Sequence, residues 1–399
     1  MALMEVAQGN RRRGKSRGSL AQSVEKWFKI AGRDLPWRRN RTPYGTLVSE
    51  AMLQQTQVAR VSPAWEAFLR QFPSVGALAR APQDRVLAAW QGLGYYRRAR
   101  NLQAAAKVIV GEYHGKIPCD RLSLEKLPGI GPYCAGAIAS IAFGQREAIV
   151  DGNVARVMMR IHGRNVDGDS RTGKAWLWNR ARDYVDESRD PALANEGLME
   201  LGAMVCTPNS PKCGECPVCK VCGAHMAGKQ DQIPTPRRRA ARSVLHVDAI
   251  LALVNGRYAL MRRPKIGLWS GLMFPPTIES PRAISRAALA QKLGVGTKAL
   301  SACGAFTFLT THRSVRFRVW SFDDASAREL KNAQENAQEN VQVNVQVNAW
   351  TWHTRSAVEK LSITSAMSKI FTLAEAQGNA NAKARARKNG GKRVTSSRL

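Results

Sequence analysis

The sequence predicts a mainly α-helical N-terminal part followed by an α+β domain, and two patterns carry this prediction. Between about residues 19 and 225, apolar residues recur at intervals of three and four, as in SLAQSVEKWFKIA and TLVSEAMLQQTQVARV, which is typical of amphipathic helices. From residue 243 apolar residues alternate instead, and Asn255-Gly256 separates two such runs, which predicts strands joined by a type I′ turn. RFRVWSF, 316–322, is predicted to be a further strand. A chain of 399 residues is long enough for two cores.

Changes in composition along the chain indicate where these parts begin and end. Both ends are rich in Lys and Arg and poor in apolar residues, which predicts disorder. Repeated NAQE and NVQV units at 332–347 are predicted to be a loop expansion without chemistry. The expected parts are a disordered basic arm (1–18), the helical part (19–225), a polar linker (226–242), the α+β domain (243–376) and a disordered basic tail (377–399).

The charge balance predicts a polyanionic partner. The chain has 61 Lys and Arg against 30 Asp and Glu, a formal net charge of +31. Such a surface attracts nucleic acid and releases its counterions on binding. The alternatives are an anionic membrane surface, for which no long basic amphipathic helix is found, and a solvated basic surface without a partner. No segment approaches the roughly 20 apolar residues that cross a bilayer, and the N-terminus lacks the apolar core of a secretory signal. These features predict a cytoplasmic protein without membrane contact.

Five of the eight cysteines are clustered, which in a reducing compartment indicates metal binding rather than disulfides. Cys206-x6-Cys213-x2-Cys216-x5-Cys222 offers four thiolates, the soft ligands that select zinc or an iron–sulfur cluster. Cys219 creates a second register of four, from Cys213 to Cys222. The spacing alone leaves open both the metal and the choice of ligands.

The segment LPGIGP, 127–132, predicts a hairpin between two helices. Gly129 and Gly131 flank one apolar residue, and Pro132 suits the first turn of the following helix. Backbone N–H groups left unpaired at such a hairpin can bind a DNA phosphate. The alternative is an ordinary helix–helix turn.

Two carboxylates have positions that suit chemistry on a sugar–base bond. Glu50 lies among apolar residues of SEAMLQQTQV, where it is either solvated or held in a pocket that raises its pKa. Asp151 stands where a helix is predicted to begin, so it either only caps that helix or also stays ionised beside the positive end of the dipole. A protonated acid and an ionised carboxylate together suit cleavage through an oxocarbenium-like sugar. Gln54, Gln55 and Tyr95 are candidates to fill the gap that an extruded base leaves in a duplex.

Five motifs in one order resemble adenine DNA glycosylases of the MutY type. They are SEAMLQQTQV, WQGLGYYRRARNL, LPGIGPYCAGAIASIAFG, VDGNVARV and the cysteine spacing, and together they cover about residues 20–225. The resemblance implies a helix-hairpin-helix DNA glycosylase fold with an iron–sulfur loop that holds a [4Fe-4S] cluster. It further implies base excision repair by a nucleoid-associated monomer, which releases adenine opposite 8-oxoguanine or guanine in double-stranded DNA.

The resemblance also assigns the chemistry. It makes Glu50 the acid that protonates adenine, Asp151 the carboxylate that stabilises the developing cation, and Asn153 a supporting residue. Tyr133 stands where endonuclease III-like glycosylase/lyases, which act on oxidised pyrimidines, have a lysine that forms a Schiff base. A phenol cannot form that imine, so the alternative of a lyase is disfavoured and strand cleavage is not expected.

Further residues of the helical part take binding roles by resemblance. Trp37 and Arg38 in LPWRR fall where the family lines the adenine pocket, and Gln55 and Tyr95 match residues that wedge beside the damaged base. The family's cluster ligands fall on Cys206, Cys213, Cys216 and Cys222, which leaves Cys219 as a departure.

The α+β domain resembles the family's Nudix-like C-terminal domain, with GLWSGLMFPP, 267–276, matching a Trp-Gly-Gly-Leu-Trp-Glu-Phe-Pro segment. It lacks a glutamate-rich metal helix, so nucleotide hydrolysis is not expected. The family reads 8-oxoguanine with a Phe-Ser-His or Phe-Thr-His loop, whereas this chain has Thr310-Thr311-His312 without the phenylalanine. Thr311 and His312 are the expected recognition residues, and the alternative for His312 is a histidine at a strand edge. The three remaining cysteines are expected to be buried structural thiols: Cys119, Cys134 and Cys303.

Overall fold

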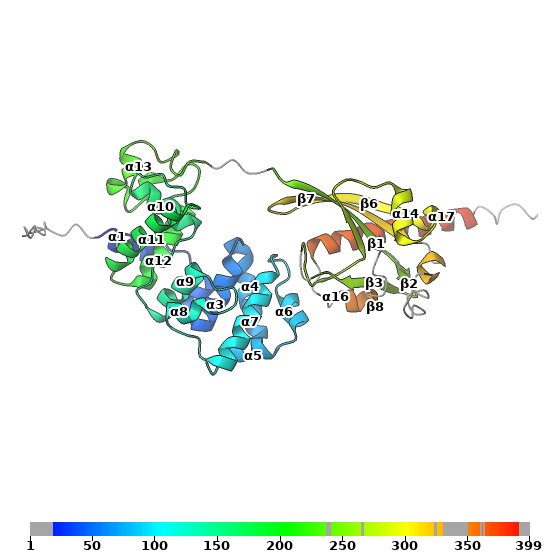
Figure 1. The fold of residues 1–399 in the computed structure, drawn as a ribbon, viewed down its shortest axis with the longest axis horizontal. Coiled ribbons are helices and arrows are strands. Elements are labelled where there is room, and N and C mark those ends of the chain that lie inside the picture. The colour runs from blue at the N-terminus through cyan, green and yellow to red at the C-terminus, as the bar shows by residue number, and fades with distance from the viewer. Residues whose placement is uncertain are drawn as a thin grey trace, which may run out of the picture. The chain divides into compact units, whose positions relative to one another are not determined.

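The computed structural model divides into two compact units (Figure 1). One comprises Met1–Ala79 and Ala104–Arg237, and the other comprises Arg80–Gln103 and Arg238–Leu399. The second unit therefore takes in a segment that the sequence analysis placed in the helical part. The expected arm at 1–18 and the repeat at 332–347 lie outside the described residues. The structure describes residues 19–236, 241–264, 267–322, 325–329, 350–359, 361 and 364–390.

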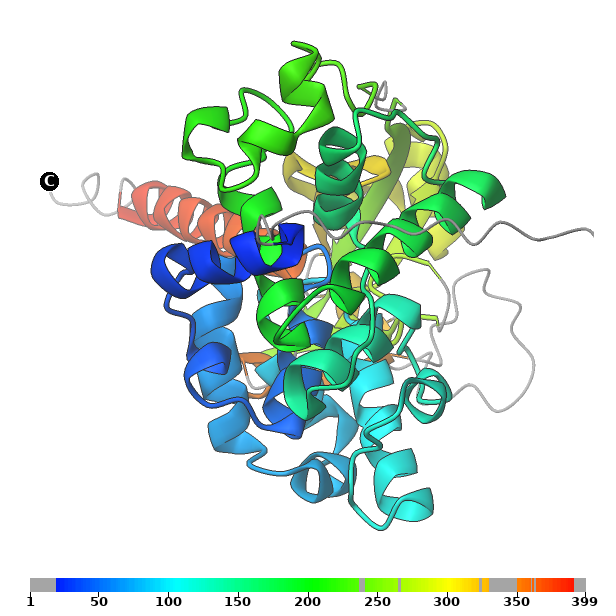
Figure 2. The same ribbon diagram turned by 90° about the vertical axis from the view of Figure 1, so that its left-hand side faces the viewer.

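The predicted helical part is confirmed, and Figure 2 turns the helices of the first unit towards the viewer. After α12 the chain forms two short 3-10 turns, Cys213–Glu215 and Cys219–Val221. The helices from residue 20 to residue 226 are α1 (Leu20–Ala31), α2 (Pro36–Arg39), α3 (Pro43–Leu53), α4 (Val58–Gln71), α5 (Val75–Arg80), α6 (Gln83–Ala89), α7 (Arg97–Glu112), α8 (Arg121–Glu125), α9 (Pro132–Phe143), α10 (Gly152–Ile161), α11 (Arg171–Asp186), α12 (Pro191–Met204) and α13 (Gly223–Met226).

Local sequence signals fix several of these helix starts. Ser19 caps α1 and Thr42 caps α3, each by accepting a hydrogen bond from a backbone N–H in the first turn. Pro132 occupies the first turn of α9, as predicted. Asp151 caps α10, so the predicted helix start is also confirmed.

Several helices of the first unit share one core. Buried side chains of α1, α9, α10, α11 and α12 meet there, among them Val24, Val157 and Leu198. α10 and α12 pack so closely that a Cβ on Gly202 would lie 2.7 Å from the Cβ of Asn153. Because close-packed helices leave little freedom, side chains projecting from them have fixed relative positions.

One expected helix is interrupted. The periodic segment 46–61 predicts continuous helix, but α3 ends at Leu53 and α4 begins only at Val58. Between them Gln55 adopts a left-handed conformation with φ of 56°. The spacing of apolar residues carries no information about the φ angle of one residue, so this turn could not be predicted from the pattern.

The second unit contains the predicted strands, arranged in two sheets. In one the order is β5-β1-β7-β6, with β1 parallel to β7 and the other pairs antiparallel. In the other, β3 pairs with β2, β4 and β8. The strands are β1 (Ser243–Leu251), β2 (Leu253–Val254), β3 (Arg257–Arg262), β4 (Met273–Phe274), β5 (Thr277–Ser280), β6 (Leu300–Leu309), β7 (Arg313–Phe322) and β8 (Trp350–Thr354).

Two predictions about these strands are confirmed. Asn255 and Gly256 join β2 to β3 with φ of 49° and 71°, the pair of positive values that a type I′ turn requires. The expected strand 316–322 lies within β7.

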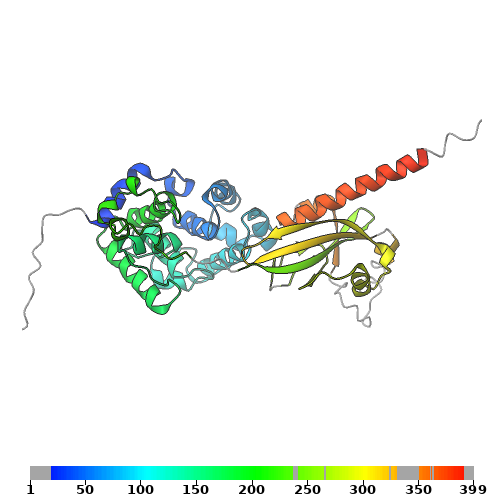
Figure 3. The same ribbon diagram turned by 90° about the horizontal axis from the view of Figure 1, so that it is seen from above.

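Helices accompany the sheets: α14 (Arg286–Leu293), α16 (Arg355–Glu359) and α17 (Ser365–Gly390). Figure 3 shows α17 beside the strands, and Met367, Ile370 and Phe371 pack into the core with Val247 and Phe317. α17 continues to Gly390, past residue 377 where the sequence analysis placed the start of the tail. This stretch is rich in Ala, Lys and Arg, which have high helix propensity. Among the described residues, no helix is both long enough and apolar enough to cross a membrane.

Candidate active site

Glu50 is buried on α3, with 5% of its surface exposed. Its Oε2 atom has no hydrogen-bond partner among the described residues. Burial raises the pKa of Glu50 to about 7, contact with Tyr133 lowers it, and the charges of Asp151 and Glu196 raise it further. The sequence left open whether Glu50 is solvated or held where its pKa is raised, and the structure shows the second arrangement. A carboxyl group of this kind is able to donate a proton near neutral pH.

Asp151 caps the start of α10, and its charge acts on both Glu50 and Tyr133. Its Oδ1 accepts a hydrogen bond from the Val154 N–H at 2.7 Å, and its Oδ2 accepts one from Asn153 Nδ2 at 3.3 Å. Burial raises the pKa of Asp151, while the N–H groups of Val154 and Asn153 and the charge of Arg156 lower it. The sequence analysis expected the helix dipole to keep Asp151 ionised, which corresponds to a lowered pKa. The pKa is raised instead, because the effect of burial outweighs these hydrogen bonds.

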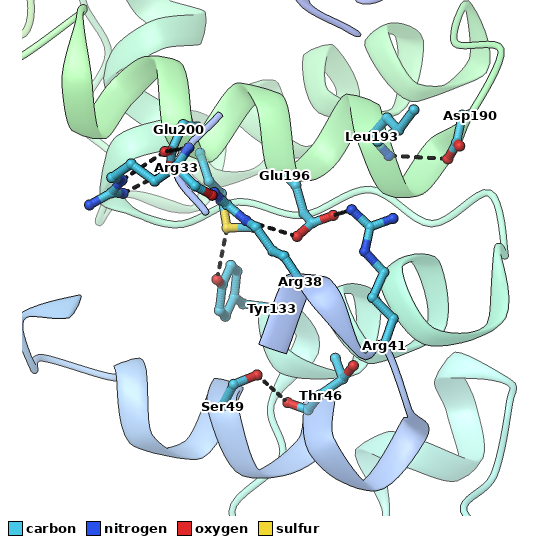
Figure 4. A network of polar contacts seen from close by, with 11 residues as sticks. Arg33, Arg38, Arg41, Thr46, Ser49, Tyr133, Asp190, Leu193, Glu196 and Glu200 are labelled. Carbon is cyan, nitrogen blue, oxygen red and sulfur yellow. Dashed lines mark hydrogen bonds and ion pairs between the residues drawn. The ribbon is translucent and has the colours of Figure 1, made fainter. Parts of the chain in front are cut away.

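Tyr133 is the second residue of α9, and the charges of both carboxylates act on it. Burial raises its pKa well above the ordinary value, and the charges of Glu50 and Asp151 raise it further, so the phenol stays protonated. Its hydroxyl donates a hydrogen bond to Met199 Sδ at 3.1 Å (Figure 4). The structure thus brings together Glu50, Tyr133, Asp151 and Asn153 from three helices.

Glu196 is a further member of this site that the sequence analysis missed. It is 3% exposed on α12, and its charge is close enough to raise the pKa of Glu50. It forms ion pairs with Arg38 and Arg41, seen in Figure 4. Burial raises the pKa of Glu196 more than these two arginines lower it. Glu196 and Glu200 stand four residues apart in the apolar helix PALANEGLMELGAM, a pattern that could have drawn attention to them.

Arg38, predicted to line a base pocket, is held between these two glutamates. Its Nε donates to Glu196 Oε1 at 3.2 Å and its Nη2 to Glu200 Oε2 at 3.1 Å. Arg33 also binds Glu200, through Nε and Nη2 at 2.7 Å each. Burial raises the pKa of Glu200, but the hydrogen bonds from Arg33 and Arg38 outweigh it and lower this pKa to about 2. The neighbouring Trp37 is buried edge-on against Trp65, with ring centres 6.2 Å apart.

The predicted hairpin lies between α8 and α9. Gly129 has φ of 80°, a conformation that favours glycine, and Gly131 precedes the first turn of α9. Gln54 and Gln55 form the turn after α3, and of the two Gln55 is exposed. These residues, like the pocket, belong to the first unit.

The predicted recognition residues of the α+β domain belong to the second unit. Thr311 and His312 are exposed in the turn between β6 and β7. Tyr95 is 47% exposed with φ of 48°, and its hydroxyl contacts the Thr311 hydroxyl. Of the three cysteines expected to be buried, Cys134 and Cys303 are buried, but Cys119 is exposed, so that expectation is wrong for Cys119.

The clustered cysteines follow α12 in the first unit. Burial raises the pKa of the Cys213 thiol, and the charges of Cys206 and Cys222 raise it further. Burial likewise raises the pKa of Cys216 to about 12, with smaller effects of Cys206, Cys222 and Cys219. Thiolates at Cys213 and Cys216 are therefore costly unless a cationic group compensates them, which fits a metal-containing cofactor. No three His, Cys, Asp or Glu side chains in the described part of the chain converge enough to hold a single metal ion.

Arginines of α10 connect this loop to the site. Arg156 Nη2 donates to Asn153 Oδ1 at 2.9 Å, and its Nε donates to the Cys206 carbonyl at 2.8 Å. Arg160 is 2% exposed, donates to Cys206 Sγ at 3.3 Å, and accepts from Cys222 Sγ at 3.2 Å through its carbonyl. The cysteine loop is thus hydrogen-bonded to the helix that Asp151 caps.

Known families match both parts of the chain. Residues 48–179 match the model of the HhH-GPD superfamily of base excision DNA repair proteins, and residues 249–373 match a NUDIX domain. These matches confirm the expected helix-hairpin-helix and Nudix-like folds. A thermostable thymine-DNA glycosylase of known structure is 28% identical with a TM-score of 0.48, over 52% of this chain and 95% of that chain.

Curated relatives give the family. The human adenine DNA glycosylase is 44% identical over 226 residues, which are 54% of this chain and 40% of the human protein. The chain spans about two fifths of the length of that relative and of its rat and mouse counterparts. The adenine DNA glycosylase of Buchnera aphidicola subsp. Baizongia pistaciae (strain Bp) is 33% identical over 267 residues, which are 66% of this chain and 75% of that protein. The chain therefore belongs to the adenine DNA glycosylase family.

Proposed function

We propose that this protein is a monofunctional DNA glycosylase that releases adenine mispaired with 8-oxoguanine or guanine in duplex DNA. The observation that carries the proposal is Glu50, a buried carboxyl group with a pKa of about 7 and one oxygen that has no hydrogen-bond partner in the described part of the chain. Such a group has a proton to give at neutral pH and an atom free to meet a ligand. The names of the relatives point to the same substrate base.

In the proposed reaction Glu50 donates its proton to N7 of an extruded adenine. The bond between C1′ and the base then breaks, the base takes the bonding electrons, and the sugar develops positive charge. The Asp151 carboxylate stabilises that cation, and water adds to C1′ while its proton passes to Glu50. Every atom of the products comes from DNA and water, so no further reactant is needed.

Tyr133 favours a glycosylase without lyase activity. Its phenol stays protonated, donates to Met199, and carries no amine that could form an imine with the sugar. The alternative, an endonuclease III-like lyase, needs such an amine.

Two further groups are proposed to serve recognition. In the first unit, the backbone at Gly129 and Gly131 is proposed to bind a phosphate, while the exposed Gln55 fills the gap left by the extruded base. In the second unit, Thr311 and His312 are proposed to read the partner base, and Tyr95 to act as a second wedge. The net charge of +31 supports binding to duplex DNA.

We further propose that the cysteine loop holds a [4Fe-4S] cluster through Cys206, Cys213, Cys216 and Cys222. The thiols of Cys206 and Cys222 both contact Arg160, whereas Cys219 influences only Cys216 among the cysteine pKa shifts. Such a group would bind thiolates and brace the loop. Iron and sulfide assays with a broad visible absorbance should be positive. Colourless protein that contains only zinc would contradict the iron–sulfur cluster.

The function is tested by incubating the protein with duplexes that carry adenine opposite 8-oxoguanine, guanine or thymine. Strand breaks are scored with and without alkali. The proposal predicts breaks opposite 8-oxoguanine and guanine, and only after alkali. Breaks without alkali would favour the lyase, and no adenine release from either mispair would overturn the proposal.

A further inference from the structure

The turn between α3 and α4 is held in an unfavourable backbone conformation. Gln55 has φ of 56°, in the left-handed region that residues with a Cβ rarely adopt. Such a conformation persists where its surroundings fix it, and such positions gather at functional sites. The turn lies directly after the helix that carries Glu50, so whatever fixes it also bears on the pocket.

The side chain of Gln54 fixes one end of this turn. Its Nε2 donates a hydrogen bond to Cys134 Sγ at 3.1 Å. Cys134 is 4% exposed on the third residue of α9, directly after Tyr133. Because α9 follows the Gly129–Gly131 hairpin, this one bond ties the end of α3 to the helix that the hairpin begins.

The spacing of these residues links the turn to the pocket. Glu50 and Gln54 stand four residues apart, so they lie on the same side of α3 near its end. Tyr133 and Cys134 are adjacent on α9, and the charge of Glu50 acts on both. α3 and its C-terminal end therefore contact α9 through two adjacent residue pairs. One pair is Glu50 and Tyr133, and the other is Gln54 and Cys134.

We infer that Gln54 is a positioning residue rather than a DNA contact, and that its bond to Cys134 sets where the exposed Gln55 enters the base stack relative to Glu50. This revises the expectation that Gln54 itself fills the gap in the duplex. The inference rests on the proposed function, because only an enzyme that extrudes a base needs this alignment. Gln54 acts through the turn, so its loss should impair base extrusion more than proton donation.

The test measures extrusion separately from chemistry. The fluorescence of a 2-aminopurine placed next to the target adenine in a duplex increases when the adenine leaves the base stack. Gln54→Leu and Cys134→Ala should each lower the extrusion equilibrium constant about fivefold, equivalent to roughly 1 kcal/mol at 1.4 kcal/mol per factor of ten. The double variant should lose no more than either single variant, since both break one bond. Cys134→Ser keeps an acceptor and should restore extrusion to within about twofold.

Controls separate this role from loss of folding and from failure of the proposed function. Gln71→Leu makes the same substitution at an exposed position at the end of α4 and should leave extrusion unchanged. Melting temperatures show whether each variant folds, and the pH midpoint of adenine release should not move, because Glu50 is intact. Fluorescence reports extrusion even if no adenine is released, so the two proposals can fail independently. Additive losses in the double variant, or unchanged fluorescence in Gln54→Leu, would overturn the inference.

Discussion

The pKa of Glu50 gives the most specific prediction about the reaction. A glutamate with the ordinary pKa of about 4.3 would be protonated in about 0.2% of molecules at pH 7, whereas a pKa of about 7 leaves about half protonated. If the protonated acid drives adenine release, the single-turnover rate should be constant at acidic pH and fall about tenfold per pH unit above 7.

Glu196 provides the perturbation that tests the cause of this pKa. Its charge raises the pKa of Glu50, so Glu196→Gln removes a negative charge and leaves Arg41 without this ion pair and Arg38 paired with Glu200 alone. All these changes favour the ionised form of Glu50, and the midpoint of the rate profile should therefore move below 7. Glu112→Gln, at an exposed position at the end of α7, is the matched control and should leave the midpoint in place.

The assay is single-turnover release of adenine from an 8-oxoguanine mispair between pH 5.5 and 9, with enzyme in excess. A wild-type rate that already falls tenfold per pH unit from pH 5.5, a rate that does not fall above pH 7, or an upward shift of the midpoint in Glu196→Gln would refute the reasoning. An unchanged midpoint in Glu196→Gln would show that Glu196 does not act on the acid.

Three further predictions concern stability and binding. Because folding raises the pKa of Glu50, its contribution to stability is present below about pH 4.3 and is lost as the pH rises through about 7. The free energy of unfolding of Glu50→Gln, measured with denaturant, should therefore rise relative to that of wild type by up to about 3 kcal/mol between pH 4 and pH 8. A difference that does not depend on pH would contradict the burial argument. Asp248 is fully buried and accepts hydrogen bonds from Arg318 and Trp320. Asp248→Ala should therefore lower the free energy of unfolding by about 3 kcal/mol. The control Glu359→Gln, at an exposed position, should lower it by less than about 0.5 kcal/mol. Gly129→Ala places a Cβ at φ of 80° and should cost about 1 kcal/mol and weaken duplex binding in a titration, whereas unaltered binding would remove the hairpin from the DNA interface.

Features encoded by neighbouring residues could be predicted from the sequence. The cap at Asp151, the proline at the start of α9 and the turn at Asn255-Gly256 depend on a few adjacent side chains, and the structure contains all three. Motif order likewise pointed to the family and to the pocket of Glu50 and Tyr133. For the cap, the proline and the turn, the signal and its consequence lie within one short segment.

Features that depend on distant contacts could not be read in this way. The ion pairs of Glu196 join it to residues more than 150 positions earlier in the chain, and its effect on Glu50 arises only when the folded chain brings α3 and α12 near each other. The net pKa shift of Asp151 depends on how deeply the folded chain buries it, which the helix cap alone does not determine. The turn after α3 is hydrogen-bonded through Gln54 to a residue 80 positions away.

Removal of the acid tests the central claim most directly. Glu50→Gln keeps the size of the side chain but cannot donate a proton from a carboxyl group, and it should lower single-turnover adenine release by about a thousandfold. Duplex affinity, measured at the same salt concentration, should stay within about threefold of wild type. Release at the wild-type rate by Glu50→Gln would contradict the account.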